Sequence, residues 1–163
     1  MKELLVTQFQ QIISNSTEED LSILSNWMDG FEKKQRGEKS TYLSAGLHME
    51  RSLTDDFCKV SIPITPLIHN NLSIPHGGII GVLLDTAMGV LANNSLPEDR
   101  AAVTTNLSVT YLATATEGHL HAHATISHKG RQTIVATGEV TDDQGKLLAI
   151  GTGSFFVIQR SRS

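Results

Sequence analysis

The stretch "NNLSIPHGGIIGVLLDTAMGVLANN", residues 70–94, decides the fold that the sequence predicts, because it is nearly all apolar and carries one carboxylate, Asp85. From about Gly78 to Asn93 the apolar residues leave almost no polar face, which is typical of a helix that a sheet covers on most sides. The run is too short and too interrupted to cross a bilayer, which requires about 20 apolar residues. We therefore expect a helix buried in protein, in which the charge of Asp85 needs an explanation.

Strand-like patterns lie on both sides of this helix. The sequence predicts two strands before it and four after it, over residues 42–50, 57–65, 101–113, 118–128, 131–141 and 146–158. Turn signals such as Lys129-Gly130-Arg131 separate the last four, and connections this short favour antiparallel hairpins in a meander. The expected fold class is therefore α+β, with an antiparallel sheet curled around one long central helix.

Residues 1–40 have a different pattern and are expected to form an N-terminal helical extension to a main domain at 41–163. Apolar residues recur at helical spacing in a first segment, at Leu4, Leu5, Phe9, Ile12 and Ile13. The motif Ser16-Thr17-Glu18-Glu19 matches a capping box, so a second helix is predicted to begin there.

Composition narrows the classes of function. The chain has 163 residues, of which 39% are hydrophobic and 18% are charged, as in an ordinary globular protein. Its formal net charge of -4 argues against nucleic acid as a partner, because that contact needs clustered Lys and Arg. Cys58 is the single cysteine and the start of the chain lacks a signal-peptide pattern, so we expect a cytoplasmic protein without a membrane partner.

The start of the central helix contains groups that can bind a carbonyl oxygen. Gly77 and Gly78 leave the first N–H groups of the helix unshielded, and the helix dipole favours negative charge there. Alternatively, the glycines only relieve crowding against the sheet. His76 stands at the cap position, where a neutral ring can hold the loop by hydrogen bonds. Asp85 is either a candidate base or nucleophile, or a carboxylate that faces solvent or a neighbouring loop.

Together these residues resemble the PaaI-like branch of the hotdog-fold acyl-CoA thioesterases, over roughly residues 41–158. The motif consists of Asn70, His76-Gly77-Gly78 and Asp85, with spacings of six and nine residues, followed by strands and a Gly-Arg turn. The resemblance implies that Asp85 activates the hydrolytic water or attacks the thioester directly. It also implies that the Gly78 amide, assisted by Gly77, polarises the thioester carbonyl.

The same resemblance assigns the remaining catalytic residues. Asn70 matches the loop asparagine of the family, and His76 matches its helix-start histidine. A strand hydroxyl that positions water matches Thr104, with Thr105 as a neighbouring alternative. Ser73 departs from the family pattern, in which glycine is common at this position.

Helix geometry adds an expectation about assembly. Gly78 and Asp85 are seven residues apart, so their backbones lie about 10 Å apart on one helix, too far for one carbonyl to contact both. We therefore expect Asp85 of one subunit to act with Gly78 and Asn70 of another, in a homodimer with shared active sites or a dimer of dimers. A carboxylate and an oxyanion site suffice for thioester hydrolysis, so no metal or organic cofactor is expected beyond the coenzyme A of the substrate.

Two further clusters give weaker signals. In the family a Gly-Arg turn lies near the CoA moiety, so Lys129, Gly130 and Arg131 are candidates for binding the phosphates of acyl-CoA, although any hairpin turn favours Lys-Gly. The other cluster consists of alternating histidines, His119, His121 and His123. They share one strand face, which is expected to be an exposed polar face rather than a metal site.

Two main classes of function follow from these patterns. The first is an acyl-CoA thioesterase that hydrolyses an acyl- or aryl-CoA to the free acid and CoA. The second is a hotdog module that binds acyl-CoA without hydrolysing it, as a sensor or carrier. Asp85, His76 and Asn70 favour the enzyme, and a hotdog dehydratase fits less well because its Asp/His hydration motif is not evident. Loose candidates for the acyl pocket are Leu83, Met88, Val90 and Tyr111.

Overall fold

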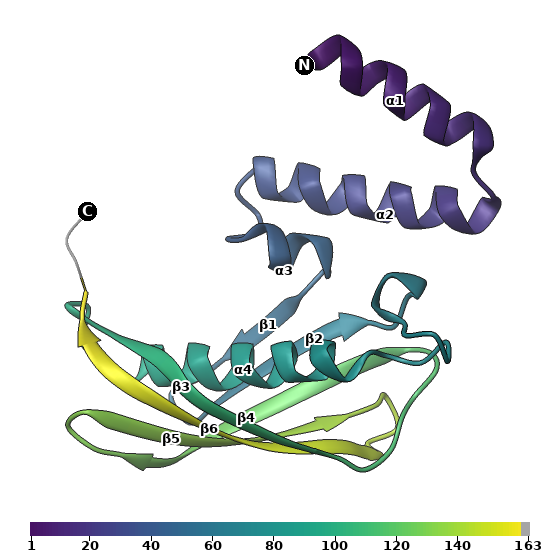
Figure 1. The fold of residues 1–163 in the computed structure, drawn as a ribbon. Coiled ribbons are helices and arrows are strands. Elements are labelled where there is room, and N and C mark those ends of the chain that lie inside the picture. Colours follow the sequence, from purple (N-terminus) through teal and green to yellow (C-terminus); the bar gives the residue numbers. More distant parts are fainter. Residues whose placement is uncertain (161–163) are drawn as a thin grey trace. The chain divides into compact units, whose positions relative to one another are not determined.

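The computed structural model describes residues 1–160 of the chain (Figure 1). The chain divides into two compact units, Met1–His48 and Met49–Ser163. The boundary expected between residues 40 and 41 falls inside the first unit, because residues 42–46 are helical and pack against the preceding helix. The assignment of separate domains stays a prediction.

The first unit is helical and consists of α1 (Lys2–Asn15), α2 (Glu18–Gln35) and α3 (Tyr42–Gly46). A capping box opens α2, one residue later than the motif predicted from the sequence. The Thr17 hydroxyl accepts a hydrogen bond from the Asp20 N–H at 3.2 Å, and the Asp20 carboxylate accepts one from the Thr17 N–H at 2.9 Å. The second predicted helix is therefore confirmed, with Thr17 as its N-cap.

The strand predicted at residues 42–50 is wrong over most of its length. Its first five residues form α3, which Thr41 caps through its hydroxyl. Helix α3 lies against α2 at Gly30, where an added Cβ would be 2.4 Å from the Ala45 carbonyl oxygen. Close packing at a glycine and a good N-cap outweigh the strand-like pattern, and the first strand begins only at Glu50.

Within residues 49–160, six strands form one antiparallel sheet in the order β1-β2-β4-β5-β6-β3. Their bounds are Glu50–Leu53 (β1), Phe57–Pro63 (β2), Arg100–Tyr111 (β3), His119–Lys129 (β4), Thr133–Thr141 (β5) and Leu147–Gln159 (β6). The predicted meander holds for β4, β5 and β6, but the predicted hairpin of β3 with β4 is wrong. Strand β3 pairs with β6 and β4 pairs with β2. The connection over residues 112–118 is long enough to cross the sheet, unlike a two-residue hairpin turn.

Helix α4 (Gly77–Asn94) is the predicted central helix, and the sheet curves around it (Figure 1). Glycines on β5 and β6 allow the close approach: a Cβ at Gly138 would be 2.9 Å from the Leu84 side chain, and one at Gly151 would be 3.0 Å from it. The predicted α+β class, with an antiparallel sheet around one helix, is confirmed. Across residues 1–160, the structure contains no helix long and apolar enough to cross a membrane.

Candidate active site

Neighbouring residues hold the first turn of α4. His76 is the N-cap, as predicted, and its Nδ1 accepts a hydrogen bond from the Gly78 N–H at 3.0 Å. Because Nδ1 is an acceptor here, a neutral His76 ring carries its proton on Nε2, which remains a donor. The Gly78 N–H is thus engaged by the ring, whereas the Gly77 N–H donates no hydrogen bond to any described residue.

The loop before α4 is a compact turn around Asn70, after the short 3₁₀ helix η1 (Pro66–Ile68). The Asn70 side-chain oxygen accepts a hydrogen bond from the Leu72 N–H at 2.8 Å, and the Asn70 N–H donates to the Ile74 carbonyl oxygen at 2.9 Å. Ser73 has a φ of 56°, in the left-handed region that glycine adopts most readily. A serine where the family pattern has glycine therefore leaves the turn intact but strains its backbone.

The carboxylate in the middle of α4 has a partner on a strand. Asp85 is half-buried, and its Oδ1 accepts a hydrogen bond from the Thr104 hydroxyl at 2.8 Å. Thr104 is exposed and lies on β3. A carboxylate can accept several hydrogen bonds, so Oδ2 keeps the capacity to bind a water molecule or a substrate. The charge is tolerated in this helix because it is neither fully buried nor unpaired.

The neighbouring threonine directs its hydroxyl elsewhere. Thr105 is the residue that the β3–β6 register skips between Thr104 and Asn106, so it forms a bulge. Its hydroxyl donates to the Ser154 carbonyl oxygen at 3.0 Å. Of the two threonines that the sequence left open, Thr104 is the one that contacts Asp85.

Sequence reasoning missed a tyrosine that contacts the start of α4. The Tyr111 hydroxyl donates to the Gly77 carbonyl oxygen at 2.9 Å, and a Cβ added at Gly77 would be 3.2 Å from the Tyr111 ring. A larger residue at position 77 would require the exposed Tyr111 ring to shift by a few tenths of an ångström, so glycine favours this close approach. Tyr111 was expected only as a loose candidate for the acyl pocket. Its position at the end of β3, the strand that carries Thr104, is the signal that could have identified it.

Two other acyl-pocket candidates belong to the core. Leu83 and Met88 have no solvent-exposed surface, because they lie on the side of α4 that the sheet covers. In a close-packed interior such side chains have no room beside them for a ligand. We therefore leave Leu83 and Met88 out of the candidate site.

The predicted catalytic residues fall into two groups, one near the start of α4 and one near its middle, and the structure does not bring the two groups together within one chain. The backbones of Gly78 and Asp85, seven residues apart on α4, are separated by about 10 Å along the axis. The first group is termed the start cluster and contains Asn70, His76, Gly77 and Gly78. The second is termed the middle cluster and contains Asp85 and Thr104.

The turn between β4 and β5 holds the residues predicted to bind CoA phosphates. The Gly130 N–H donates to the Thr133 carbonyl oxygen at 2.8 Å, which closes the turn. The Lys129 ammonium group donates to the Ser95 carbonyl oxygen, just beyond the end of α4. Arg131 is exposed and forms no ion pair or hydrogen bond with the described part of the chain. Its guanidinium group is therefore open to an anionic ligand.

The alternating histidines of β4 contact two different residues, Asp143 and Phe57. The Asp143 carboxylate accepts hydrogen bonds from His121 Nε2 at 2.7 Å and from the His119 N–H at 3.0 Å. The hydrogen bond from His121 is the main reason that the pKa of Asp143 is lowered. His123 instead stacks on Phe57, with ring centroids 5.2 Å apart. In the part of the chain that the structure describes, no three His, Cys, Asp or Glu side chains are arranged to hold a metal ion.

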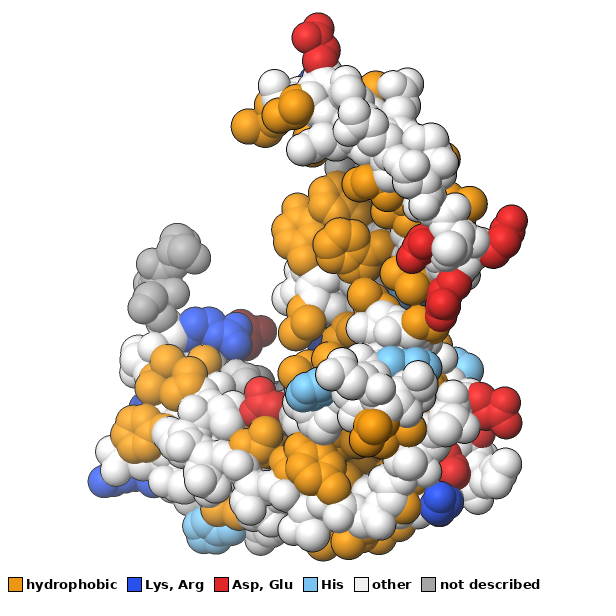
Figure 2. Space-filling view, turned by 45° about the vertical axis from the view of Figure 1, so that its right-hand side comes forward, with side chains coloured by type: hydrophobic (Ala, Val, Ile, Leu, Met, Phe, Trp, Pro, Cys, Tyr) orange, Lys and Arg blue, Asp and Glu red, His pale blue; other side chains and the backbone are white. Residues whose placement is uncertain are grey.

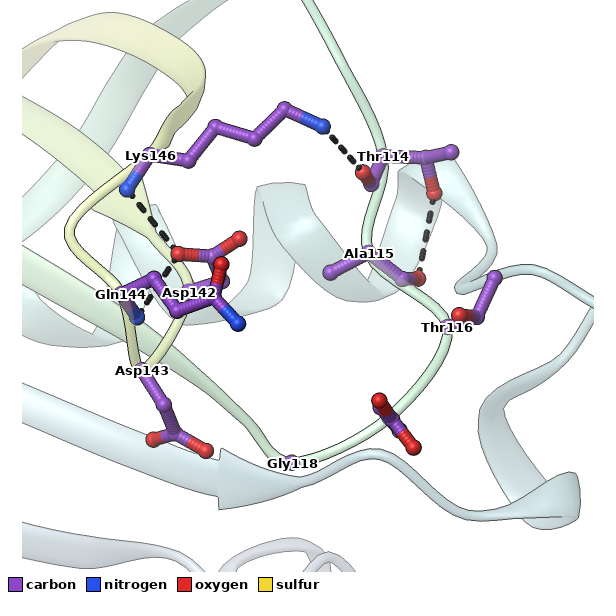
Figure 3. Close-up of a pocket in the computed structure, with 9 residues that line it drawn as sticks. Thr114, Ala115, Thr116, Gly118, Asp142, Asp143, Gln144 and Lys146 are labelled. Atoms are coloured by element: carbon purple, nitrogen blue, oxygen red, sulfur yellow. Dashed lines mark hydrogen bonds between the residues drawn. The ribbon is translucent and has the colours of Figure 1, made fainter.

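Asp143, the partner of these histidines, also lines a pocket (Figure 3). It has a volume of about 550 Å³ and is lined by the loop at 114–118 and the turn at 142–146. A second hollow, of about 620 Å³, lies on the sheet face opposite α4, and half of the residues that line it are threonine or serine. Neither contains a residue of the start cluster or the middle cluster.

The comparisons with known proteins agree on one family. The sequence matches a family model described as the thioesterase superfamily over residues 73–149. It is 30% identical to a 1,4-dihydroxy-2-naphthoyl-CoA hydrolase of Listeria monocytogenes, over 56% of this chain and 74% of that protein. It is also 30% identical to the acyl-coenzyme A thioesterase PaaI of Escherichia coli, over 63% of this chain and 71% of that protein.

A solved structure extends this likeness to most of the chain. A Bacillus halodurans protein, crystallised with CoA, is 40% identical and superposes with a TM-score of 0.88. The match covers 94% of this chain and 99% of that one. It therefore includes much of the N-terminal helical unit as well as the sheet and α4.

Proposed function

This chain belongs to the thioesterase superfamily of hotdog-fold proteins, and we propose that it hydrolyses acyl- or aryl-CoA thioesters to the free acid and CoA. It is a thioester hydrolase, like the relatives named above. The observation that carries the proposed mechanism is the half-buried Asp85 carboxylate, which the Thr104 hydroxyl contacts at 2.8 Å. The CoA in the Bacillus halodurans structure supports CoA as the thiol carrier.

In the proposed reaction, Asp85 acts on a water molecule or on the thioester itself. As a base, Asp85 takes a proton from water while the water oxygen attacks the carbonyl carbon. The C–S bond then breaks, and the CoA thiolate takes up a proton. As a nucleophile, Asp85 first forms a mixed anhydride and releases CoA, after which water hydrolyses the anhydride. Either route uses one carboxylate and needs no metal or organic cofactor.

The start cluster is proposed to bind the carbonyl oxygen as it gains negative charge. The Gly77 N–H and the His76 Nε2–H are free donors there, and the dipole of α4 adds a favourable field. The Gly78 N–H, which the family pattern assigns to this role, becomes available only when the His76 ring turns away from it. Asn70 and His76 would then position the substrate around this donor.

The two clusters are proposed to act together across a homodimer interface. The separation of about 10 Å along α4 keeps them from sharing one carbonyl within a chain. Strand β3 supports the dimer, because this 12-residue strand lies at the sheet edge and pairs within the described chain only with β6. Open strand edges tend to pair with another strand. A second copy that pairs at β3 would approach the middle cluster, in a dimer or a dimer of dimers.

The β4–β5 turn is proposed to contact the phosphates of CoA through Arg131, with Lys129 and Gly130 beside it. The open guanidinium group of Arg131 supports this role. Substitution Arg131→Ala should raise KM for acyl-CoA about tenfold and leave kcat almost unchanged, because it removes binding that the ground state and transition state share. The control is an acyl thioester of a short thiol without phosphates, for which KM should not change.

Release of free thiol from a panel of acyl-CoAs tests the proposed function. The panel contains short, medium, long and aromatic acyl groups, and the matched control protein is Asp85→Asn. We expect turnover of at least one thioester by the unmodified chain and its loss in the variant. Tight binding of a thioester without thiol release would instead support the non-catalytic binding module.

Mixing two inactive variants tests the shared site. Asp85→Asn removes the middle cluster and Asn70→Ala weakens the start cluster. A mixed dimer with shared sites contains one site with both changes and one intact site, so it should recover about half of the wild-type rate. Mixed dimers that are verified by mass and stay inactive would contradict a shared site.

A further inference from the structure

Helix α1 presents an apolar face in which no residue is buried. The face consists of Leu5, Val6, Phe9, Ile12 and Ile13, which fall within one sector of the helix. The opposite face is polar apart from Leu4. A 14-residue helix in which no residue is buried is marginally stable in water, so α1 needs a surface that covers its apolar face.

A second apolar surface lies on α2 and α3. Trp27, Phe31 and Tyr42 remain 59%, 51% and 63% exposed, and the Phe31 and Tyr42 rings contact each other at a centroid distance of 5.5 Å. Apolar side chains gather visibly on the helical unit in Figure 2. This surface is termed the aromatic patch and contains Trp27, Met28, Phe31, Tyr42 and Leu43. Trp and Tyr are typical of the centres of protein interfaces.

The α1 face and the aromatic patch together are large enough for a specific interface. At about 80–100 Å² for each half-exposed large side chain, they leave on the order of 900 Å² of apolar surface accessible. A stable complex buries about 800 Å² per partner, which the two surfaces of one chain reach together but neither reaches alone. An interface that uses both surfaces of each chain would therefore be of standard size.

Charge argues against a lipid occupant. Helix α1 contains one cation, Lys2, which Glu3 offsets, and residues 18–20 at the start of α2 are all acidic. Anionic membranes attract amphipathic helices through rows of Lys and Arg, which α1 lacks. Of the cations at the end of α2, Lys33 is paired with Asp29, and Arg36 is paired with Glu32 and Glu38. An apolar protein surface therefore fits the α1 face better than an anionic membrane does.

The chain itself supplies such a surface, and its connection favours exchange. Ser16 and Thr17 link α1 to α2 in extended conformation, with ψ of 145° and 170°. A two-residue extended link limits how α1 can fold back onto the helix that follows it. Short links of this kind favour exchange of an element between identical chains.

We propose that α1 of one copy packs its apolar face on the aromatic patch of a second copy, which returns its own α1 in the same way. Each chain contributes one helix and one patch, so the contact is two-fold symmetric and closes as a dimer. This contact is separate from the chemistry at α4, and it gives the N-terminal unit a role in assembly.

Disulfide trapping in the full chain tests the exchange. A panel combines Val6→Cys or Ile13→Cys on α1 with Met28→Cys or Leu43→Cys on the patch. The native Cys58 does not compete, because it is fully buried and burial raises the pKa of its thiol. After mild oxidation we expect a covalent dimer on a non-reducing denaturing gel for at least one pair, and much less for each single variant. Cross-links only within one chain, or none in any pair, would overturn the proposal.

Substitutions on the two faces of α1 provide the matched control. In the trapping background, Leu5→Lys with Ile12→Lys should lower the dimer yield at least about tenfold, because two apolar contacts are lost. Gln10→Lys with Ser14→Lys adds the same charge on the polar face and should leave the yield unchanged. Equal losses in both would refute face-specific docking.

Co-sedimentation with phosphatidylserine and phosphatidylcholine vesicles tests whether the α1 face binds lipid instead of a second copy of the chain. We expect the unmodified chain to stay in solution. Binding that the Leu5→Lys, Ile12→Lys variant loses would assign the α1 face to lipid and overturn the exchange. Because trapping and co-sedimentation use no activity assay, failure of the proposed function would not affect their results.

Discussion

The polar groups at the start and in the middle of α4 differ in how far away in the sequence their hydrogen-bond partners lie. At the start, His76 and Asn70 each accept a hydrogen bond from a backbone N–H two residues further along the chain. In the middle, Asp85 depends on Thr104, which is 19 residues away on another element. The start cluster can therefore form with the helix and its loop, whereas the middle cluster exists only once β3 lies in register beside α4.

The largest expected effect comes from removing the carboxylate of the middle cluster. Asp85→Asn should lower kcat about 100-fold to 10,000-fold, because a positioned base or nucleophile contributes on that scale. The measurement is steady-state thiol release, with circular dichroism to verify folding. Asp55→Asn, an exposed carboxylate in the β1–β2 turn, is the matched control and should retain full activity. A kcat for Asp85→Asn within threefold of wild type would exclude the assigned role.

A smaller effect is expected from the long-range partner of Asp85. Thr104→Val keeps the side-chain shape but removes a hydrogen bond to a charged group, so kcat should fall about 10-fold to 100-fold. Thr105→Val is the matched control, because its hydroxyl is bonded to the Ser154 carbonyl oxygen. Its kcat should change less than about threefold. The reverse order of effects would place the water-positioning hydroxyl on Thr105 and contradict the observed register.

The start cluster offers a milder test, because Tyr111 contacts Gly77 without being expected to touch the reacting atoms. Tyr111→Phe loses one neutral hydrogen bond and should lower kcat about 2-fold to 10-fold. Tyr42→Phe, at the other tyrosine of the sequence, is the control and should leave kcat unchanged. If Tyr111 positions the carbonyl-binding turn, the loss should appear in kcat more than in KM. A change in KM alone would indicate a contact with the acyl group.

The smallest effect is expected outside both clusters, at Asp143. Its pKa is lowered in the folded chain below its ordinary value of 3.8, mainly by the His121 hydrogen bond. The carboxylate therefore contributes stability above about pH 4, and this contribution is lost as the pH falls through the lower, folded-state pKa. Asp143→Asn should melt at a slightly lower temperature than wild type at pH 7, and the difference should shrink as the pH falls through the folded-state pKa of Asp143.

Thermal melts followed by circular dichroism across this pH range would measure the difference, with activity near wild type at pH 7. A difference that does not shrink on acidification below the ordinary pKa of 3.8 would assign the effect to packing rather than to the ionised carboxylate. A large loss of activity in Asp143→Asn at pH 7 would show that catalysis depends on residues outside the start and middle clusters.

Much of the fold could be predicted because helices and turns depend on contacts between near neighbours. The apolar run from Gly78 to Asn93 identified the central helix to within one residue at each end. His76 could be recognised as a cap because capping also acts over two or three residues. The errors fell where distant segments decide the outcome, at α3, which packs on Gly30, and at β3, which pairs with β6 rather than β4.

The sequence by itself determined that a carboxylate lies two turns beyond an unshielded helix start, since that spacing is a property of the α-helix. Only the tertiary structure decided that Thr104, rather than Thr105, contacts Asp85, and that Tyr111 contacts Gly77. The physical reason is register: a one-residue bulge changes the face on which the next side chain lies, and bulges arise from pairing between strands far apart in sequence.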